Sequence, residues 1–306
     1  MRTLFVGAGA TGGYFGGRLA SAGHDVTFLV RPGRADTLRR RGLRIKSPDG
    51  ETVVQPRLVT ADAVGGPYDL VVLAVKSYAL EQSLIDMAPA VGPRTVIVPL
   101  LNGIRHIDEL VGAFGPDRAW GGVCMIHASL DENGDVVQLT GLHRLGYGPL
   151  DGEWDPRLPE VTYALTGPDF DSHPSLTITQ DMWEKWSLLA CLGAATTLMR
   201  GTIGEINAAP GGRELTGRMA AEAVAVLAAA GHPHRAGALA LLQSTMAAEL
   251  QTTSSLYRDL TRGLPVEADA IVGDFITEAG KHDVPVPTLA AAYTNLSIYS
   301  ARRSAG

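Results

Sequence analysis

Hydrophobic residues in the first half of the chain form short uninterrupted runs, separated by segments with helical spacing. Four runs are typical of parallel strands buried on both faces: residues 4–6, 26–30, 70–75 and 95–100. Residues 80–88 and 107–114 carry apolar positions three and four apart, which predicts helices. The alternation predicts an α/β fold with a Rossmann-type, doubly wound, mainly parallel sheet.

The pattern changes near residue 175. Shorter strand patterns precede that point, at residues 43–46, 52–60, 120–128, 136–140 and 143–147. Beyond Asp181 the pattern predicts helices only, at residues 183–199, 214–230, 236–250, 255–262, 267–280 and 288–300. We therefore expect a nucleotide-binding domain over residues 1–175 and an all-helical substrate and catalytic domain over 176–306. Ligands favour domain interfaces and the carboxyl ends of strands, so a cleft is expected there.

A glycine pattern follows the first strand directly. Gly7, Gly9 and Gly12 match G-x-G-x-x-G between a strand and a helix, and a second strand follows that helix. Such glycines allow a tight turn, close approach of a diphosphate to the backbone, and close helix packing. The alternative is a glycine-rich turn without a ligand. The dinucleotide-binding residues predicted in this loop are Gly7, Ala8, Gly9, Ala10, Thr11 and Gly12.

The residue after the second strand indicates which dinucleotide binds. NAD sites place an acidic residue there for the ribose 2′-hydroxyl, whereas this chain has Arg31. A guanidinium suits a 2′-phosphate, so the sequence favours NADPH as the cofactor. The alternative is that Arg31 and Arg34 are solvated loop charges. The basic run at residues 39–41 is interpreted as a solvated helix end.

Composition narrows the class of protein. A net charge of −6 argues against general binding to nucleic acid or anionic membranes. The two cysteines, Cys124 and Cys191, lie in apolar runs, which fits a reduced cytoplasmic protein without disulfides. We predict no metal site, and we interpret His232-Pro233-His234 as a turn. No signal peptide or membrane span is expected, and the chain is compatible with a homodimer.

Four polar residues are candidates for chemistry in the expected cleft. Lys76 and Asn102 follow buried strands, where ligand groups commonly lie. Lys185 lies between Trp183 and Trp186, and a desolvated lysine can exchange a proton near neutral pH. The fourth candidate is Glu267, which begins a later predicted helix. The alternative interpretation of Lys185 is a lysine on the helix surface, and that of Glu267 is a carboxylate favoured by a helix N-terminus.

At these residues the chain resembles the ketopantoate reductases (2-dehydropantoate 2-reductases). The motifs are GAGATG, LAVKSYAL, LLNG, WEKW and TSSLYRDLTRGLPVEADAI, spread over nearly the whole chain. The resemblance implies that Lys185 protonates the carbonyl oxygen while NADPH delivers hydride to its carbon. It implies that Glu267 holds a substrate hydroxyl and that Ser255 holds the carboxylate. Asn102 and Lys76 would lie at the nicotinamide and substrate ends of the cleft.

The chain departs from this family on one helix face. The family carries asparagines four and eight residues after the lysine, where this chain has Leu189 and Gly193, and Thr252 replaces a third. Positions i, i+4 and i+8 share a face, so a less polar and roomier pocket is expected. Three hypotheses compete: a reductase of a small 2-oxo acid such as ketopantoate, a relative reducing a bulkier or less polar ketone or imine, and a non-catalytic NADP(H) sensor.

Overall fold

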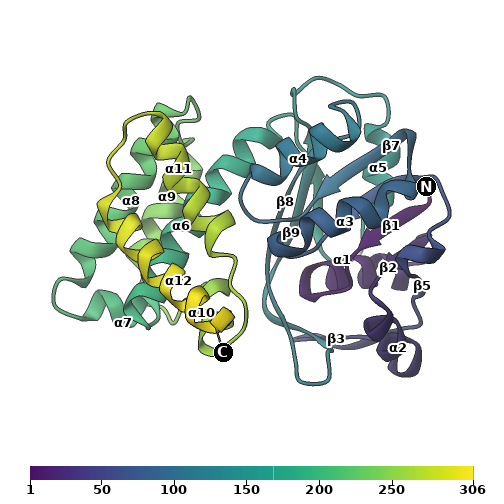
Figure 1. Cartoon of the computed structure of the whole chain (residues 1–306), viewed down its shortest axis with the longest axis horizontal. Coiled ribbons are helices and arrows are strands. Elements are labelled where there is room, and N and C mark those ends of the chain that lie inside the picture. The colour runs from purple at the N-terminus through teal and green to yellow at the C-terminus, as the bar shows by residue number, and fades with distance from the viewer. Residues whose placement is uncertain (168, 306) are drawn as a thin grey trace. The chain divides into compact units, whose positions relative to one another are not determined.

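The computed structural model describes residues 1–167 and 169–305, and the chain divides into two compact units. The first unit contains Met1–Leu101 and His106–Thr179, and the second contains Asn102–Arg105 and the chain from Gln180 onward. The first unit combines strands and helices, whereas the described part of the second is helical (Figure 1).

A five-stranded parallel sheet forms the first layer of the first unit. Its strands lie in the order β5-β2-β1-β6-β7 and span Arg57–Val59, Val26–Leu29, Thr3–Val6, Tyr68–Leu73 and Val91–Pro99. The connecting helices are α1 (Ala10–Ser21), α2 (Pro32–Arg41), α3 (Leu80–Met87) and α4 (Arg105–Phe114), with short 3₁₀ turns at Ala61–Ala63, Ser77–Ala79 and Ala88–Ala90. Residues 70–73 are fully buried, as expected for a strand covered on both faces. The predicted parallel sheet is confirmed.

A second five-stranded sheet was not expected from the sequence. It contains β3 (Leu43–Ser47), β4 (Gly50–Val54), β8 (Trp120–Leu130), β9 (Val136–Pro149) and β10 (Asp171–Pro174). The pairs β3–β4 and β8–β9 are antiparallel, and β9 is one continuous strand where two were predicted. β10 and helix α5 (Leu158–Leu165) also escaped prediction. β10 pairs in parallel with β9, a long-range contact that local spacing does not encode.

Helix α1 packs closely against both sheets because small residues line two of its faces. A Cβ atom on Gly16 would lie 2.7 Å from the ring of Phe28, which belongs to β2 of the parallel sheet. A Cβ atom on Gly17 would lie 2.7 Å from the Ile45 side chain of the second sheet. The two glycines therefore explain how α1 can occupy the layer between the sheets.

The second unit is built around helix α6 (Ile178–Met199). The other elements are α7 (Ile203–Ala208), α8 (Gly212–Ala229), α9 (Ala236–Met246), α10 (Ser255–Thr261), the π-helical turn η4 (Asp269–Gly273), α11 (Asp274–Lys281) and α12 (Pro287–Ala305). Thr202 and Glu205 form a reciprocal capping box that begins α7. The predicted helices are present, but the one expected over 236–250 ends at Met246 and the one expected over 267–280 starts with the π-helical turn.

Cys124 and Cys191 are free thiols, both buried. Among the described residues, no helix combines the length and apolarity needed to cross a membrane.

Candidate functional site

The glycine loop lies against the carboxyl end of β6 and is open on one side. Gly7 has φ of +97°, and a Cβ atom there would lie 2.9 Å from the Ala74 carbonyl oxygen. A Cβ atom on Gly12 would approach the Gly7 carbonyl oxygen to 2.2 Å, so a side chain cannot fit. A Cβ atom on Gly9, in contrast, would meet no protein atom within 4 Å. The loop therefore has two glycines required by packing and one that leaves space for a ligand.

The N-terminus of α1 is suited to an anion. The first hydrogen bond of the helix runs from Gly13 N to the Gly9 carbonyl, at 2.8 Å. The preceding N–H groups of Ala10, Thr11 and Gly12 have no helical acceptor. No side chain caps this end and no acidic residue lies in its first turn. These donors, together with the space at Gly9, fit the diphosphate of a dinucleotide.

The two arginines that follow β2 have different environments. Arg31 is exposed at the N-cap position of α2, where its carbonyl accepts from Arg34 N and Ala35 N, both at 3.0 Å. Its guanidinium makes no hydrogen bond or ion pair with any residue in the described ranges. Arg34 is half-buried, and its Nε and Nη2 atoms donate to the Ala8 carbonyl at 3.2 and 2.9 Å. The interpretation of Arg34 as a solvated charge is therefore wrong.

The basic run that ends α2 is also more ordered than expected. Arg39 pairs with Asp36 at 3.1 Å, and Arg41 pairs with the buried Asp135 at 3.2 Å. Only part of this helix end is a simple solvated surface.

Lys76 and Asn102 fall in different units. Lys76 is half-buried and precedes the 3₁₀ turn Ser77–Ala79, close in sequence to Ala74, which contacts Gly7 and Gly12. Asn102 is half-buried and begins a short loop that belongs to the second unit. A Cβ atom on Gly103 would lie 2.4 Å from the Ala270 carbonyl oxygen, which brings this loop against the segment that follows Glu267.

Helix α6 is accessible to solvent at two positions within a long buried stretch. From Met182 to Thr197 every residue is buried except Lys185 and Leu189. These two residues are four apart and therefore lie on the same face. Lys185 and Leu189 thus form the accessible part of an otherwise buried stretch of α6.

Glu267 is held near this helix through backbone and aromatic contacts. Its side chain is buried, and its carbonyl accepts from Ile271 N at 3.2 Å. The carbonyl of Ile271 in turn accepts a hydrogen bond from Trp186 Nε1 at 3.0 Å. The Trp186 ring also packs edge-on against Phe275, with centroids 4.9 Å apart. The residue after Lys185 is therefore fixed to the helical segment that follows Glu267.

Ser255 is the first residue of α10, and the residue before it, Ser254, connects this helix to α6. The buried Ser254 caps α10 by accepting from Tyr257 N at 2.9 Å, and its hydroxyl pairs with Thr196 Oγ1 at 2.8 Å. Ser255 itself is half-buried. Ser254 was not predicted as a site residue, although a serine followed by a helical pattern is an N-cap signal.

The extra room expected at Gly193 is absent. A Cβ atom on Gly193 would lie 2.7 Å from Leu256 Cδ1, so the leucine of α10 fills this position. Leu256 belongs to a hydrophobic cluster that includes Ala268 and Ile271, and Leu189 packs against its edge. The loss of polarity along this face remains, but the added space does not.

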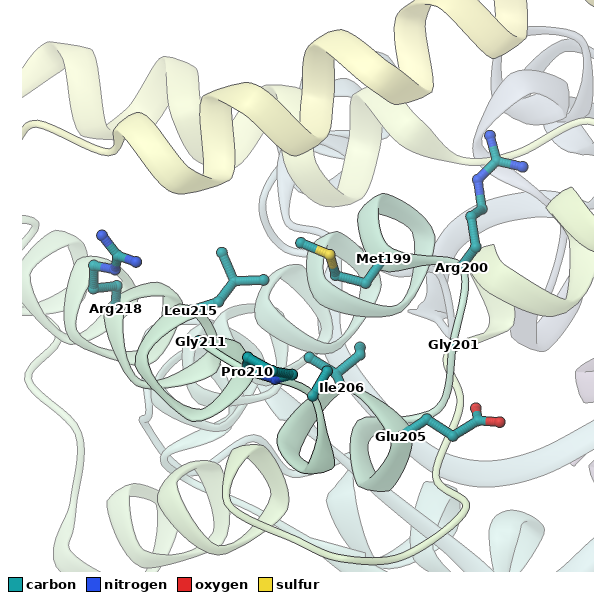
Figure 2. A pocket seen from close by; sticks show the side chains of 11 residues that line it. Met199, Arg200, Gly201, Glu205, Ile206, Pro210, Gly211, Leu215 and Arg218 are labelled. Atoms are coloured by element: carbon teal, nitrogen blue, oxygen red, sulfur yellow. The ribbon is translucent and has the colours of Figure 1, made fainter.

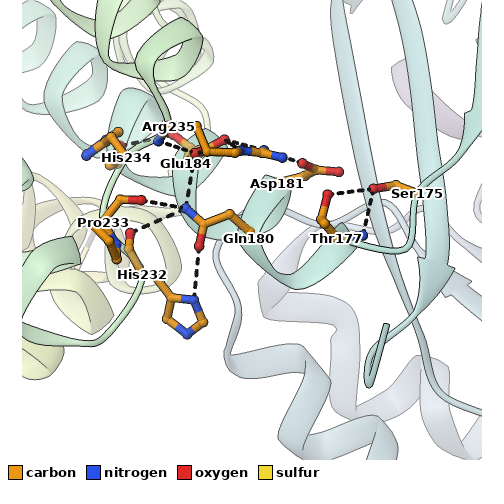
Figure 3. Close-up of polar contacts among 10 residues, drawn as sticks. Ser175, Thr177, Gln180, Asp181, Glu184, His232, Pro233, His234 and Arg235 are labelled. Atoms are coloured by element: carbon orange, nitrogen blue, oxygen red, sulfur yellow. Dashed lines mark hydrogen bonds and ion pairs between the residues drawn. The ribbon is translucent and has the colours of Figure 1, made fainter. Parts of the chain in front are cut away.

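A polar network lies beside Lys185 and was missed in the sequence. Figure 3 shows Gln180, Asp181 and Glu184 of α6 directed toward the loop that carries Arg235. The backbone N–H of Arg235 donates to Glu184 at 2.8 Å, and its guanidinium bonds both carboxylates. Although burial opposes ionisation, the bonds from Arg235 hold the pKa of Glu184 below its usual value. The network anchors the first half of α6.

Two histidines of the same loop pack on α6. His232 stacks on Trp183 with centroids 4.6 Å apart, and His234 Nε2 lies 2.7 Å from Ser187 Oγ. Burial lowers the pKa of both histidines. The predicted turn at His232-Pro233-His234 therefore packs against α6. Among the described residues, no group of three or more side chains is placed to hold a metal ion.

A surface pocket of about 370 Å³ lies at the other end of α6, between α7 and α8. Met199, Ile206 and Leu215 contribute its apolar walls, and Arg200 and Arg218 extend from its edges (Figure 2). None of the residues predicted to bind cofactor or substrate lines it.

Comparisons with known proteins cover nearly the whole chain. Residues 3–152 match the protein-family model described as "Ketopantoate reductase PanE/ApbA", and residues 177–300 match its C-terminal counterpart. The chain is 35% identical over 304 residues to the "Uncharacterized oxidoreductase YkpB" of Bacillus subtilis (strain 168), covering 99% of this chain and 100% of the relative. It is 28% identical to a 2-dehydropantoate 2-reductase of Halobacterium salinarum, covering 94% and 95%.

A solved structure shares the fold at lower identity. A D-mandelate dehydrogenase bound to NADH and anilino(oxo)acetate matches with a TM-score of 0.87 at 20% identity, covering 99% of both chains.

Proposed function

The chain belongs to the ketopantoate reductase family of oxidoreductases, and from that premise we propose that it is an NADPH-dependent reductase of a 2-oxo acid. The product would be the corresponding 2-hydroxy acid. Ketopantoate is the family's reference substrate, and we propose that this chain favours a 2-oxo acid with a less polar side group. The alternative is a relative that reduces another ketone or an imine.

The glycine loop supports the cofactor part of the proposal. The open side of Gly9 and the unpaired N–H groups of α1 suit a diphosphate. The exposed guanidinium of Arg31 would bind a ribose 2′-phosphate, because it stands where NAD-binding proteins place an acidic residue. By the family resemblance, Asn102 and Lys76 would lie at the nicotinamide and substrate ends of the site.

Lys185 supports the chemical part. The bound cofactor would supply hydride to the carbonyl carbon. Negative charge then develops on the carbonyl oxygen, and an ammonium group stabilises and protonates it. Lys185 is accessible within a stretch of α6 that is otherwise almost entirely buried, as a proton donor must be. Glu267 would hold a substrate hydroxyl or its equivalent, and Ser255 the carboxylate.

The single observation that carries the substrate proposal is the apolar character of the α6 face beside Lys185. Leu189 is accessible there, and Leu256 fills the space at Gly193. Hydrogen bonds from amide side chains favour binding of a polar substrate, and this preference is lost when the amides are absent. The fold does not dictate ketopantoate, since a D-mandelate dehydrogenase shares it.

Steady-state oxidation of NADPH with a panel of 2-oxo acids tests the proposal, with the 2-hydroxy acid identified as the product. Turnover with at least one 2-oxo acid is expected. Tight NADPH binding without turnover on 2-oxo acids, ketones or imines would favour the non-catalytic sensor instead. Turnover restricted to ketones or imines would favour the alternative reductase.

A further inference from the structure

The guanidinium of Arg34 binds the backbone of the glycine loop. Its Nε and Nη2 atoms both donate to the carbonyl oxygen of Ala8, at 3.2 and 2.9 Å. Ala8 is buried, and its carbonyl belongs to the peptide that joins it to Gly9. Two donors from one rigid, planar group fix the direction of that carbonyl more firmly than one bond would.

Fixing this carbonyl also fixes the N–H of Gly9. The peptide bonds of the described chain are trans. In a trans peptide the C=O and N–H groups point in opposite directions. With the Ala8 carbonyl directed at Arg34, the Gly9 N–H is directed away from it. Gly9 is the loop residue whose missing side chain leaves open space.

The turn between β8 and β9 also lies against Arg34. A Cβ atom on Gly134 would lie 2.7 Å from Arg34 Nη1, so the turn lies directly against the guanidinium, and the φ of +78° at Gly134 favours glycine there. Asp131 shapes this turn by accepting from the N–H groups of Asn133 and Asp135, both at 2.9 Å. The buried Asp135 accepts ion pairs from Arg41 and Lys46, at 3.2 and 3.0 Å. The turn is thus anchored to α2 and β3.

Arg34 is not placed as a typical phosphate ligand. It is half-buried, its burial lowers its pKa, and the charge of Asp135 opposes that change. Two of its nitrogen atoms are occupied by a neutral carbonyl. Arg31, one turn earlier, is exposed and has its donors available. The two arginines of the same helix start therefore suit different tasks.

We propose that Arg34 is a positioning residue that holds the Ala8–Gly9 peptide in the orientation needed to bind the dinucleotide diphosphate, whereas Arg31 reads the 2′-phosphate. This inference rests on the proposed function, because it presupposes that a dinucleotide binds the loop. It assigns Arg34 to a feature that NADPH and NADH share. Loss of Arg34 therefore weakens both cofactors equally.

Dissociation constants measured by calorimetry for four ligands test this assignment. They are NADPH, NADH, ADP-ribose, which keeps the diphosphate, and adenosine 2′-monophosphate, which lacks it. Arg34→Gln is expected to weaken the first three by the same factor, about 10-fold for the loss of charge-assisted hydrogen bonds. The affinity for adenosine 2′-monophosphate should stay within about twofold. Arg31→Ala should give the opposite pattern, weakening NADPH and adenosine 2′-monophosphate but not NADH.

Two further variants guard against a trivial effect on folding. Arg34→Lys keeps the charge but cannot make the paired bonds, so it should reproduce the equal loss at a smaller size, with a melting temperature near that of the native protein. Arg40→Gln, an exposed arginine on the same helix, is the matched control and should change none of the four constants.

Three outcomes overturn the assignment. Selective loss of NADPH and adenosine 2′-monophosphate in Arg34→Gln would make Arg34 a phosphate ligand. Unchanged constants in a folded Arg34→Gln would make its bonds irrelevant to binding, while leaving the proposed function intact. A native protein that binds neither NADPH nor NADH contradicts the proposed function as well.

Discussion

The indole Nε1 of Trp186 donates a hydrogen bond to the carbonyl oxygen of Ile271 at 3.0 Å, with both residues buried. This bond connects the turn of α6 that carries Lys185 to the π-helical turn that follows Glu267. π-Helical turns are rare and frequently occur at functional sites. Lys185 and Glu267, both proposed to act on substrate, therefore lie on segments that are fixed to each other.

Replacing Lys185 by alanine should lower turnover by about 10²–10⁴-fold, the usual contribution of a positioned general acid. The affinity for NADPH should remain within about twofold, because the proposed cofactor contacts lie elsewhere. Single-turnover rates and NADPH binding measured together check this. Lys281→Ala is the control, since Lys281 is an exposed lysine paired with Glu278 on α11. Near-native turnover in Lys185→Ala would remove the assignment.

Glu267→Gln should raise KM or lower kcat while leaving the melting temperature unchanged. The substitution keeps the shape of a buried side chain and removes only its charge. A purely structural carboxylate at a helix start contributes about 0.3–1 kcal/mol to stability. Glu214→Gln, at the exposed first turn of α8, measures that structural contribution separately. If melting changes and kinetics do not, Glu267 serves the fold.

Gly193→Asn should destabilise the folded protein by about 1–3 kcal/mol, the usual effect of overpacking a core. Its new side chain would collide with Leu256, whose Cδ1 atom lies 2.7 Å from the Cβ position. Denaturant unfolding measures the effect. Gly217→Asn is the matched control, because a Cβ atom there meets nothing within 4 Å. When Leu256→Ala is combined with Gly193→Asn, the total loss of stability should be smaller than the sum of the losses in the two single variants. Strict additivity would show that the two positions do not interact.

Stability should decline as the pH falls below about 6.5, the pKa of an ordinary histidine. Burial lowers the pKa of His234, against the opposing charge of Glu184, and its Nδ1 atom has no partner among the described residues. The unfolded chain then binds a proton that the folded protein resists, so acid favours unfolding. His234→Gln can still bond Ser187 but cannot titrate. Its melting temperature should fall less between pH 8 and pH 5; an identical decline would exclude His234 as a cause.

The sequence predicted the parallel sheet, the glycine loop and the helical second half, because each has a local pattern. The packing roles of Gly16 and Gly17 have no such local pattern. Their partners, Phe28 and Ile45, belong to two different sheets. The second sheet was missed because its strands pair across distant parts of the chain, as β10 does with β9.

Helical spacing placed Lys185, Leu189 and Gly193 on one face of α6, and in the structure Lys185 and Leu189 are both partly accessible. It did not show that Leu256, from another helix, fills the third position. Arg34 and Arg31 look alike in sequence, and only the bond to Ala8 separates them. Contacts between separate elements are the part that periodicity cannot supply.

The most direct test of the proposed function is the ratio of kcat/KM values for ketopantoate and for 2-oxo acids with hydrocarbon side groups, all measured with NADPH. Two missing amide hydrogen bonds, each worth about 0.5–1.5 kcal/mol, predict about 5- to 150-fold weaker use of ketopantoate than by an enzyme that retains them. We therefore predict that a 2-oxo acid with an apolar side group has the higher kcat/KM. A native protein that prefers ketopantoate, at about 10⁵ M⁻¹ s⁻¹ or above, would contradict the shifted preference.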